Sequence, residues 1–394
     1  QPRIPMGEGA YDVTLADLNQ DGVLDIITPD SEANSISIRY GYGDGSFGAR
    51  TVINTDAEGP IMVKVADMNQ DGWSDLIVAF CGLSIHSGFG AELCDATKGG
   101  VRVYLGNKLN QYQVDTSRSL TGAIHALDIG DLNHDGALDI VASNRDSVEL
   151  FFSTTINGSV SAENPWMTHS LIVNPNFNVG FNKATYDVQV SDWNGDGSLD
   201  VIFTLSQRIS GNDNPNYNGN FIGILLNDGT GQYAELSYNE NQALTEVYSI
   251  EALLLGLNAS HPACKGSPIC AADLLASHFT IGEFTGDGRP DIAIALFGTI
   301  KGAAIREENN WVAIIAGGEQ TRLDPTQVMT HNTLPIAEND PPCSDYFVNT
   351  DQNIANRSMT RISDIQAIDL DGDGAQELIA ISSDAESEYQ LLGL

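Results

Sequence analysis

The chain has 394 residues, of which 42% are hydrophobic and 18% charged, so we expect a packed fold rather than disorder. Its 53 acidic residues outweigh 18 basic ones and give a formal net charge of -35, which argues against nucleic acid as a partner, because such binding needs clustered Lys and Arg. No stretch approaches the roughly 20 apolar residues that a membrane-spanning helix needs, so we expect no membrane insertion.

Nonapeptides centred on Asp-Gly divide the chain into repeats. In chain order they read DLNQDGVLD (17–25), DMNQDGWSD (67–75), DLNHDGALD (131–139), DWNGDGSLD (192–200), EFTGDGRPD (283–291) and DLDGDGAQE (369–377). Because six such matches cannot arise by chance in one chain, they mark a repeated structural unit.

Strand patterns recur around every nonapeptide. An alternating segment precedes it, as in YDVTLAD (11–17), and a β-branched apolar segment follows, as in LDIITP (24–29). These two patterns predict a hairpin of strands. Third strands are expected at 35–41, 101–106, 148–153, 221–227, 311–317 and 388–393, and fainter fourth strands at 49–54 and 326–332.

Four antiparallel strands per repeat predict an all-β fold, a β-propeller of four-stranded blades that forms a single domain over residues 1–394. Six blades are detected, and seven are possible, because the segment 243–275 suits either a helical insertion or a seventh blade without a loop motif. We expect insertions near 81–98, 206–220, 241–275 and 336–357. The N-terminal segment 2–9 is expected to supply the outer strand of the last blade and so close the ring.

The spacing of oxygen-bearing residues in each nonapeptide predicts calcium binding. Calcium takes six to eight oxygen ligands, which alternate positions of a tight loop can present to one centre. Positions 1, 3, 5 and 9 offer side-chain oxygens, position 6 is the Gly of a sharp turn, and position 7 offers its backbone carbonyl. An Asp-Gly hairpin turn would explain one or two copies, but not acids at positions 1, 5 and 9 in all six.

The predicted ligands number five in each loop, and about six Ca²⁺ ions are expected. They are Asp17, Asn19, Asp21, Val23 and Asp25; Asp67, Asn69, Asp71, Trp73 and Asp75; Asp131, Asn133, Asp135, Ala137 and Asp139; Asp192, Asn194, Asp196, Ser198 and Asp200; Glu283, Thr285, Asp287, Arg289 and Asp291; and Asp369, Asp371, Asp373, Ala375 and Glu377. The fifth loop departs from the pattern at Glu283 and Thr285, which predicts weaker binding there.

With these loops and third strands such as VRVYLGN and ISIRYGYGDGSF, the chain resembles the FG-GAP (VCBS-type) repeats of integrin α-subunit propellers and of many secreted bacterial proteins. The resemblance covers nearly the whole chain outside the insertions. It implies a propeller, usually of seven blades, with calcium in the hairpin loops of one face and partner contacts on the opposite face or the inserted loops. It implies no particular partner, because such repeats occur in adhesins, lectin-like binders, enzyme accessory domains and lyases.

The cysteines favour an oxidising compartment. Cys81 and Cys94 bracket a Gly-rich segment, Cys264 and Cys270 bracket a short loop, and both pairs are candidate disulfides, while Cys343 is left over. Because the chain starts at Gln1, we expect a secreted or cell-surface protein whose signal peptide has been removed.

Residue patterns for catalysis are scarce. Neither G-x-S-x-G, H-E-x-x-H nor C-x-x-C occurs, and His125 and His134 beside the third loop are poor candidates for a catalytic base. Trp73 and Trp193 suit either a sugar-stacking platform or packing against a neighbouring blade. We therefore expect no catalytic residue, no enzyme activity and no organic cofactor.

The favoured function is a binding, adhesion or assembly module for extracellular protein or glycan; a polysaccharide lyase and a purely structural subunit are the alternatives.

Overall fold

The computed structural model describes residues 4–82, 94–95, 97–122, 124–144, 147–153, 155–156, 159–160, 166–172, 182–208, 219–231, 233, 247–249, 273–286, 288–299, 309–317, 323–332, 362–368, 377–383 and 389–393. The chain divides into two compact units, each described by itself below. The first comprises residues 1–176, 184–203 and 225–236, and the second comprises 177–183, 204–224 and 237–394.

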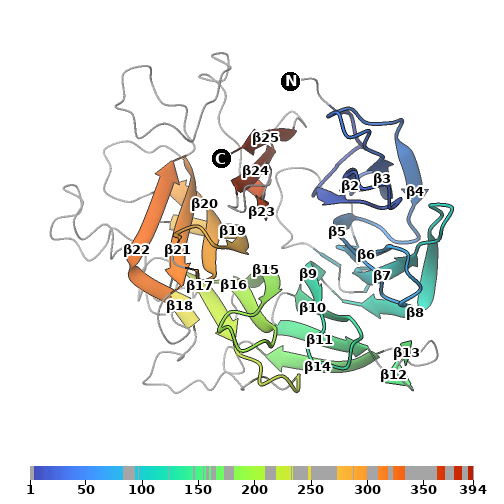
Figure 1. Ribbon diagram of the computed structural model, residues 1–394. Helices are drawn as coiled ribbons and strands as arrows, with labels where there is room; N and C mark the ends of the chain where they lie inside the picture. The colour runs from blue at the N-terminus through green and yellow to red at the C-terminus, as the bar shows by residue number, and fades with distance from the viewer. Residues whose placement is uncertain are drawn as a thin grey trace, which may run out of the picture. The chain divides into compact units, whose positions relative to one another are not determined.

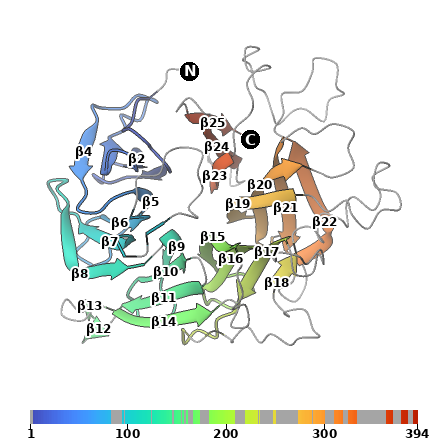
Figure 2. The same ribbon diagram turned by 180° about the vertical axis from the view of Figure 1, so that it is seen from behind.

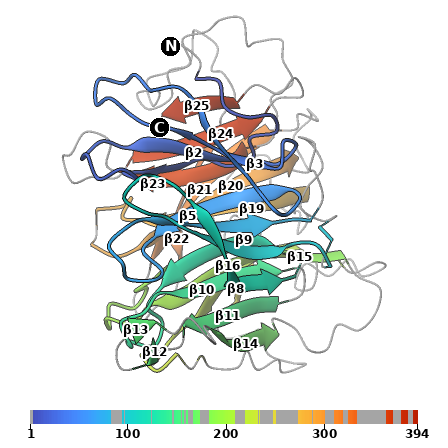
Figure 3. The ribbon, with the colours of Figure 1, turned by 90° about the vertical axis from the view of Figure 1, so that its right-hand side faces the viewer.

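The described secondary structure consists of strands, in antiparallel sheets that follow the chain (Figure 1, Figure 2). The first sheet holds β1 (Thr14–Ala16), β2 (Asp25–Asp30), β3 (Ser35–Arg39) and β4 (Thr51–Asn54); the second holds β5 (Pro60–Ala66), β6 (Asp75–Phe80), β7 (Gly100–Leu105) and β8 (Gln113–Thr121). In the third, β9 (Ile124–Gly130), β10 (Asp139–Asn144), β11 (Ser147–Ser153) and β14 (Trp166–Ile172) lie side by side, with a small hairpin of β12 (Thr155–Ile156) and β13 (Ser159–Val160) between β11 and β14 in sequence (Figure 3).

Three further sheets complete the series. The fourth has the order β15 (Asn182–Ser191), β16 (Asp200–Arg208), β17 (Gly219–Leu225) and β18 (Val247–Ser249). The fifth has β19 (Asp273–Gly282), β20 (Asp291–Thr299), β21 (Asn309–Gly317) and β22 (Leu323–Asn332), and the sixth has β23 (Ile362–Ile368), β24 (Glu377–Ser383) and β25 (Tyr389–Gly393). The prediction of an all-β fold built from four-stranded antiparallel repeats is confirmed, including the third strand of every repeat; the number of blades stays a prediction.

Consecutive sheets of each unit pack through apolar faces. In the first unit, Ile27 and Ile38 of the first sheet share a buried cluster with Val63, Leu76 and Phe80 of the second. All five side chains are fully buried or nearly so. Burying such side chains contributes on the order of 1.5–3 kcal/mol each, which makes sheet-to-sheet contact the main stabilising element of the repeats.

In the second unit, the fifth and sixth sheets pack in the same way. Ala293 and Val312 of the fifth sheet contact a cluster that includes Ile365 and Leu378 of the sixth. The inner strands are buried on both faces, as in β6 and at residues 292–295 of β20, whereas the outer strands β1 and β4 of the first sheet are partly exposed.

A polar residue three positions before the loop also joins the first strands of neighbouring repeats. Thr14 Oγ1 donates a hydrogen bond to the carbonyl oxygen of Val63 at 2.5 Å, and Lys64 Nζ lies 3.1 Å from Asp128 Oδ1. Asp128 Oδ2 in turn accepts from the backbone N–H of Val190 at 2.9 Å. Within the first unit these contacts hold the first strands, and hence the loops that follow them, in a fixed series.

The N-terminal segment contacts the first sheet. The carbonyl oxygens of Glu8 and Gly9 accept hydrogen bonds from the backbone N–H groups of Ala33 and Ser31, at 3.2 and 2.8 Å, in the turn between β2 and β3. Residues 4–9 form no strand in the structure as described. The predicted role of this segment as outer strand of the last blade stays a prediction.

Two predicted insertions are shorter than expected at their ends. Val247–Ser249, placed in the insertion near 241–275, forms β18 and pairs with Phe221–Gly223 of β17, while Asp273–Leu275 begins β19. The ends of the insertion near 206–220 likewise belong to strands, since β16 extends to Arg208 and β17 begins at Gly219. Most of 241–275 and all of 336–357 lie outside the described residues, so the choice between a helical insertion and a seventh blade stays open.

Candidate metal-binding loops

The predicted loops join the first two strands of successive sheets. The first four follow β1, β5, β9 and β15 and end where β2, β6, β10 and β16 begin, and the fifth lies between β19 and β20. The sixth loop lies outside the described residues, apart from Glu377 at the start of β24. The sequence therefore located all of the described loops correctly at the hairpin ends of their sheets.

The second loop shows how positions 1, 3 and 5 are brought together. Asp67 Oδ1 and Asn69 Oδ1 both accept a hydrogen bond from the backbone N–H of Asp71, each at 3.0 Å, and Asp67 Oδ2 accepts from Gly72 N–H at 2.8 Å. Asn69 Nδ2 donates to Asp71 Oδ2 at 3.0 Å, and Asp71 Oδ1 accepts from Trp73 N–H at 2.9 Å. This network fixes three oxygen-bearing side chains around one turn of backbone.

Most of this network recurs in three other loops, although in the fourth the N–H of Asp196 donates to Asn194 Oδ1 and leaves Asp192 Oδ1 without a partner. In the first, Asp17 accepts from the N–H groups of Asp21 and Gly22, at 3.1 and 2.8 Å. The third loop repeats these contacts at 3.2 and 2.9 Å, and in the fourth loop Asp192 Oδ2 accepts from Gly197 N–H at 3.0 Å. One sequence pattern thus gives one loop geometry, independent of the variable residues at positions 2, 7 and 8.

The Gly at position 6 has the conformation that its sequence position predicts. Its φ is 83° in Gly22, 88° in Gly72, 83° in Gly136, 90° in Gly197 and 77° in Gly288. Only glycine adopts such angles without steric cost, which explains its presence in every loop.

The acid at position 9 has a structural role that the sequence did not reveal. Asp75 is fully buried, and its two oxygens accept from the N–H groups of Met68 in the loop and Gly106 after β7, at 2.9 and 2.8 Å. Asp25, Asp139, Asp200 and Asp291 make the same pair of contacts, one with position 2 of their own loop and one with the last residue of the third strand or a residue up to two positions after it. The carboxylate at position 9 therefore connects each of these loops by hydrogen bonds to the end of the third strand of its sheet. Its additional role as a metal ligand stays a prediction.

Burial changes the acidity of these carboxyls. Burial raises the pKa of Asp139 to about 7, against the lowering effect of the N–H donors of Ser153 and Leu132, and the charges of Asp131 and Asp135 raise it further. Burial likewise raises the pKa of Asp75 and Asp200 to about 6. In the absence of a cation, the acids of one loop thus oppose each other's ionisation.

The fifth loop differs, as its sequence predicts. Glu283 Oε1 accepts from Gly286 N–H at 2.5 Å, a contact three residues along rather than five. Asp291 Oδ2 accepts from the N–H groups of both Phe284 and Thr285, at 2.7 and 2.9 Å. Asp287, at position 5 of this loop, lies outside the described residues.

Whether these residues fit a cation can be tested on their oxygen atoms. Within the described ranges, no three His, Cys, Asp or Glu side chains are placed together to hold a metal. Five buried side-chain oxygens of the described residues lack a hydrogen-bond partner, and two of them occupy predicted ligand positions: Asp192 Oδ1 at position 1 and Thr285 Oγ1 at position 3. Two carboxylates, an amide oxygen and a backbone carbonyl form an oxygen set that fits a hard cation completed by water.

The structure also shows how exposed the tryptophan and histidine residues of the loops are. Trp193 is 5% exposed, which favours packing over a sugar-stacking platform, whereas Trp73 is half-buried in its loop. His134 is exposed at position 4 of the third loop, as expected.

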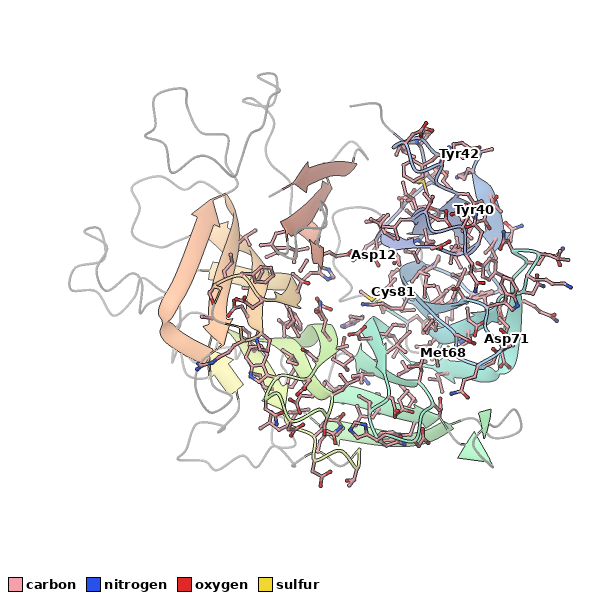
Figure 4. All side chains as sticks on the ribbon, in the orientation of Figure 1. Asp12, Tyr40, Tyr42, Met68, Asp71 and Cys81 are labelled. Atoms are coloured by element: carbon pink, nitrogen blue, oxygen red, sulfur yellow. A yellow bond between two sulfur atoms is a disulfide. The ribbon has the colours of Figure 1, made fainter. Side chains whose placement is uncertain are left out.

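Cys81 and Cys94 form the predicted disulfide, with Cα atoms 4.5 Å apart, and Figure 4 shows Cys81 well separated from Asp71 of the second loop. Cys264, Cys270 and Cys343 lie outside the described residues.

The sequence reading missed the side chains that connect one loop to the next. Gln20 and Gln70 at position 4 reach the following loop, and Asn227 after β17 joins the third and fourth loops. The one available signal was the repetition of N-Q-D-G in the first two loops. Asn227 had no such signal.

Comparison with known proteins agrees with this geometry in the first two repeats. Residues 17–78 match an FG-GAP-like repeat, a span that starts at the first residue of the first loop and includes the second loop. The resemblance to FG-GAP repeats is thereby confirmed; a specific likeness to integrin subunits stays a prediction. No curated protein matches the chain significantly.

Several solved structures resemble the whole chain at low identity. They include the rhamnogalacturonan lyase YesW (10% identity, TM-score 0.40, covering 100% of this chain and 74% of that one) and a Lactobacillus plantarum protein (13%, 0.44, 97% and 83%). A third is the V. cholerae biofilm matrix protein Bap1 (11%, 0.34, 97% and 69%). Similarity at this level carries no functional assignment. Among the described residues, no helix has the length and hydropathy needed to cross a membrane.

Proposed function

We propose that the chain is a calcium-stabilised FG-GAP repeat protein that acts outside the cell as a non-enzymatic binding, adhesion or assembly module. The observation that carries this proposal is the repetition of one preorganised oxygen loop in four described repeats, with an unpartnered buried oxygen, Asp192 Oδ1, at a predicted ligand position. Positions 1, 3, 5 and 7 would hold the ion, which would supply positive charge among clustered acids.

The charge of the chain supports this reading. A net charge of -35 destabilises a compact fold by self-repulsion, and cations held only by the folded chain would offset it. The Cys81–Cys94 disulfide supports a place outside the reducing cytosol, as expected for a secreted or cell-surface protein.

Apolar side chains beside the first loop support a contact surface. Leu24, at position 8, is 49% exposed, and Tyr42, in the turn after β3, is 66% exposed. This turn packs on the loop, since a side chain at Gly41 would meet the Leu24 carbonyl oxygen and Val23 Cγ1. An aromatic ring that presents an apolar face and a hydroxyl suits contact with a glycan or a protein partner.

Calcium binding is tested by isothermal titration and by thermal unfolding. We expect about six calcium ions per chain, and a ligand present at about 100 times its Kd stabilises the folded state by about 2.7 kcal/mol per site, so EGTA should lower the Tm by many degrees. An unchanged melting curve with EGTA, together with no heat of calcium binding, would overturn the proposal.

The binding role is tested by screening glycans and polysaccharides with and without calcium. We expect calcium-dependent retention without cleavage, weakened in Tyr42→Ala. The matched control is Tyr11→Ala, a less exposed tyrosine ahead of the same hairpin. Release of unsaturated uronates would instead establish the lyase alternative, and self-association without ligand retention would favour a structural subunit.

A further inference from the structure

The fourth residue of each early loop contacts the next loop along the chain. Gln20 Nε2 donates a hydrogen bond to the carbonyl oxygen of Gly72 at 2.7 Å, and Gln70 Nε2 donates to that of Gly136 at 2.6 Å. Both acceptors are the sixth residue of the receiving loop, so the two contacts are equivalent. They join the first three loops of the first unit into a series.

The series extends to the fourth loop by a looser contact. His134, the fourth residue of the third loop, places Nε2 3.5 Å from Ser198 Oγ, at position 7 of the fourth loop. Every described loop of the first unit is therefore connected to its neighbour through position 4.

The backbone at position 4 gives a second, independent observation. Gln20, Gln70 and His134 have φ angles of 59°, 61° and 56°, in the left-handed region that disfavours side chains, whereas the fourth and fifth loops have Gly195 and Gly286 there. A long side chain thus occupies a strained position in each loop that contacts a following one.

The accepting peptide also holds a predicted ligand of its own loop. Gly72 N–H donates to Asp67 Oδ2 at 2.8 Å, and Gly136 N–H donates to Asp131 Oδ2 at 2.9 Å. The path from Asp21 to its neighbour Gln20, then to Gly72 and Asp67, therefore runs from one candidate site to the next through one side-chain hydrogen bond.

We propose that Gln20 and Gln70 couple divalent-cation binding between neighbouring loops, an inference that rests on the proposed uptake of calcium. A cation held by Asn19 and Asp21 fixes Gln20 between them, and Gln20 then fixes the Gly72 peptide of the second loop. Binding at the second loop costs less ordering when the first is already ordered, and the coupling is reciprocal.

The test measures one loop while its neighbour is changed. Terbium takes the oxygen sites of calcium, and Trp73, at position 7 of the second loop, can sensitise its luminescence; the part of the signal lost in Trp73→Phe reports that loop. Asp21→Asn disables the first loop. Gln20→Asn keeps a neutral amide and suits left-handed backbone, but it is one methylene too short to reach Gly72.

We expect Asp21→Asn to raise the half-saturating terbium concentration of the second loop by about 2- to 10-fold, the range set by one hydrogen bond. Gln20→Asn should cause a similar shift, and the double variant should be no weaker than either single one. Gln113→Asn, at an exposed glutamine of β8 outside the loops, should cause none.

The outcomes separate this inference from the proposed function. Absence of terbium luminescence and of calcium heat in the wild-type chain would overturn both. Normal binding that is unaffected by Asp21→Asn, or independent additive effects of Asp21→Asn and Gln20→Asn, would overturn the coupling alone. If Asp21→Asn fails to fold by circular dichroism, the comparison of Gln20→Asn with Gln113→Asn decides, since equal half-saturation of the two variants contradicts coupling.

Discussion

Asn227 Nδ2 donates a hydrogen bond to the carbonyl oxygen of Leu132, 2.7 Å away, although 95 residues separate them. The same amide donates to the Leu199 carbonyl oxygen at 3.1 Å, and Asn227 Oδ1 accepts from the N–H groups of Gly229 and Gly231. Leu132 belongs to the third loop and Leu199 to the fourth. One buried side chain, 3% exposed, thus fixes the spacing of two candidate sites with all its polar atoms satisfied.

Asn227→Asp should be strongly destabilising, because a carboxylate would face two carbonyl oxygens and lose both donated hydrogen bonds. We expect a loss of about 2–5 kcal/mol in the free energy of unfolding, measured by urea denaturation. The control is Asn107→Asp, in the corresponding turn of the second repeat. The Oδ1 atom of Asn107 is exposed and accepts two hydrogen bonds, and an aspartate keeps this acceptor. We expect the control to change the free energy of unfolding by less than about 0.5 kcal/mol. Equal losses in the two variants would contradict this role of Asn227.

Asp75→Ala should destabilise the chain even without metal, because it leaves the buried N–H groups of Met68 and Gly106 without an acceptor. The expected loss is about 2–5 kcal/mol in the presence of EGTA. The control is Asp44→Ala, which also removes a carboxylate that accepts a backbone N–H, from Ser46, but in an exposed turn, and it should destabilise the chain far less. A loss for Asp75→Ala that appears only with calcium would assign this carboxylate to the metal instead.

The sequence predicted the hairpins because their determinants are local. Alternating apolar residues in 60–66 and the Asp-Gly turn at 71–72 depend on a few adjacent positions, and the strands follow. The role of position 9 could not be read in this way. The partner of Asp75, the N–H of Gly106, lies 31 residues away, directly after the third strand, so local sequence alone does not distinguish this acid from a metal ligand.

Contacts between repeats were the least predictable feature. Gln20 meets Gly72, and Asn227 meets Leu132, only after the sheets have packed, and no short-range pattern encodes that geometry. The predicted ends of the insertions were wrong for a related reason. The sequence places Val247–Ser249 in an insertion, but pairing with β17 makes it a strand, because tertiary pairing overrides weak local preference.

Gly72→Ala isolates the backbone requirement of the loops. A Cβ at Gly72 would meet nothing within 4 Å, yet its φ of 88° is unfavourable for any side chain, so we expect a loss of about 1–2 kcal/mol in EGTA. Gly122→Ala serves as the control, because its Cβ would meet only Ile124 Cδ1, at 3.6 Å, and its φ is not left-handed. That variant should be neutral or stabilising by up to about 1 kcal/mol in the same urea titration. A neutral Gly72→Ala would show that the loop relaxes to another conformation.

The Cys81–Cys94 disulfide closes a segment with a sequence separation of 13, which by chain entropy contributes about 3 kcal/mol. Reduction with dithiothreitol should therefore lower the Tm of the wild-type chain. The Cys81→Ala/Cys94→Ala variant should start at the lower Tm and show no response to the reductant. A response of equal size in this variant would place the effect on another cysteine pair.

The buried carboxyl of Asp139 predicts an unusual pH dependence in metal-free protein. Its pKa is raised from 3.8 to about 7 in the folded chain, chiefly by burial, so the folded state binds this proton more tightly than the unfolded state does. The associated stability is fully present below the unfolded pKa and is lost as the pH rises through about 7. With EDTA present, this contribution should make the wild-type chain lose stability between about pH 4 and about pH 7. Asp139→Asn, which cannot ionise, removes this contribution, so the difference in unfolding free energy between wild type and variant should shrink over that interval. A difference that stays constant with pH would contradict the raised pKa, and one that grows with pH would mean that the ionised carboxylate is the form the fold prefers.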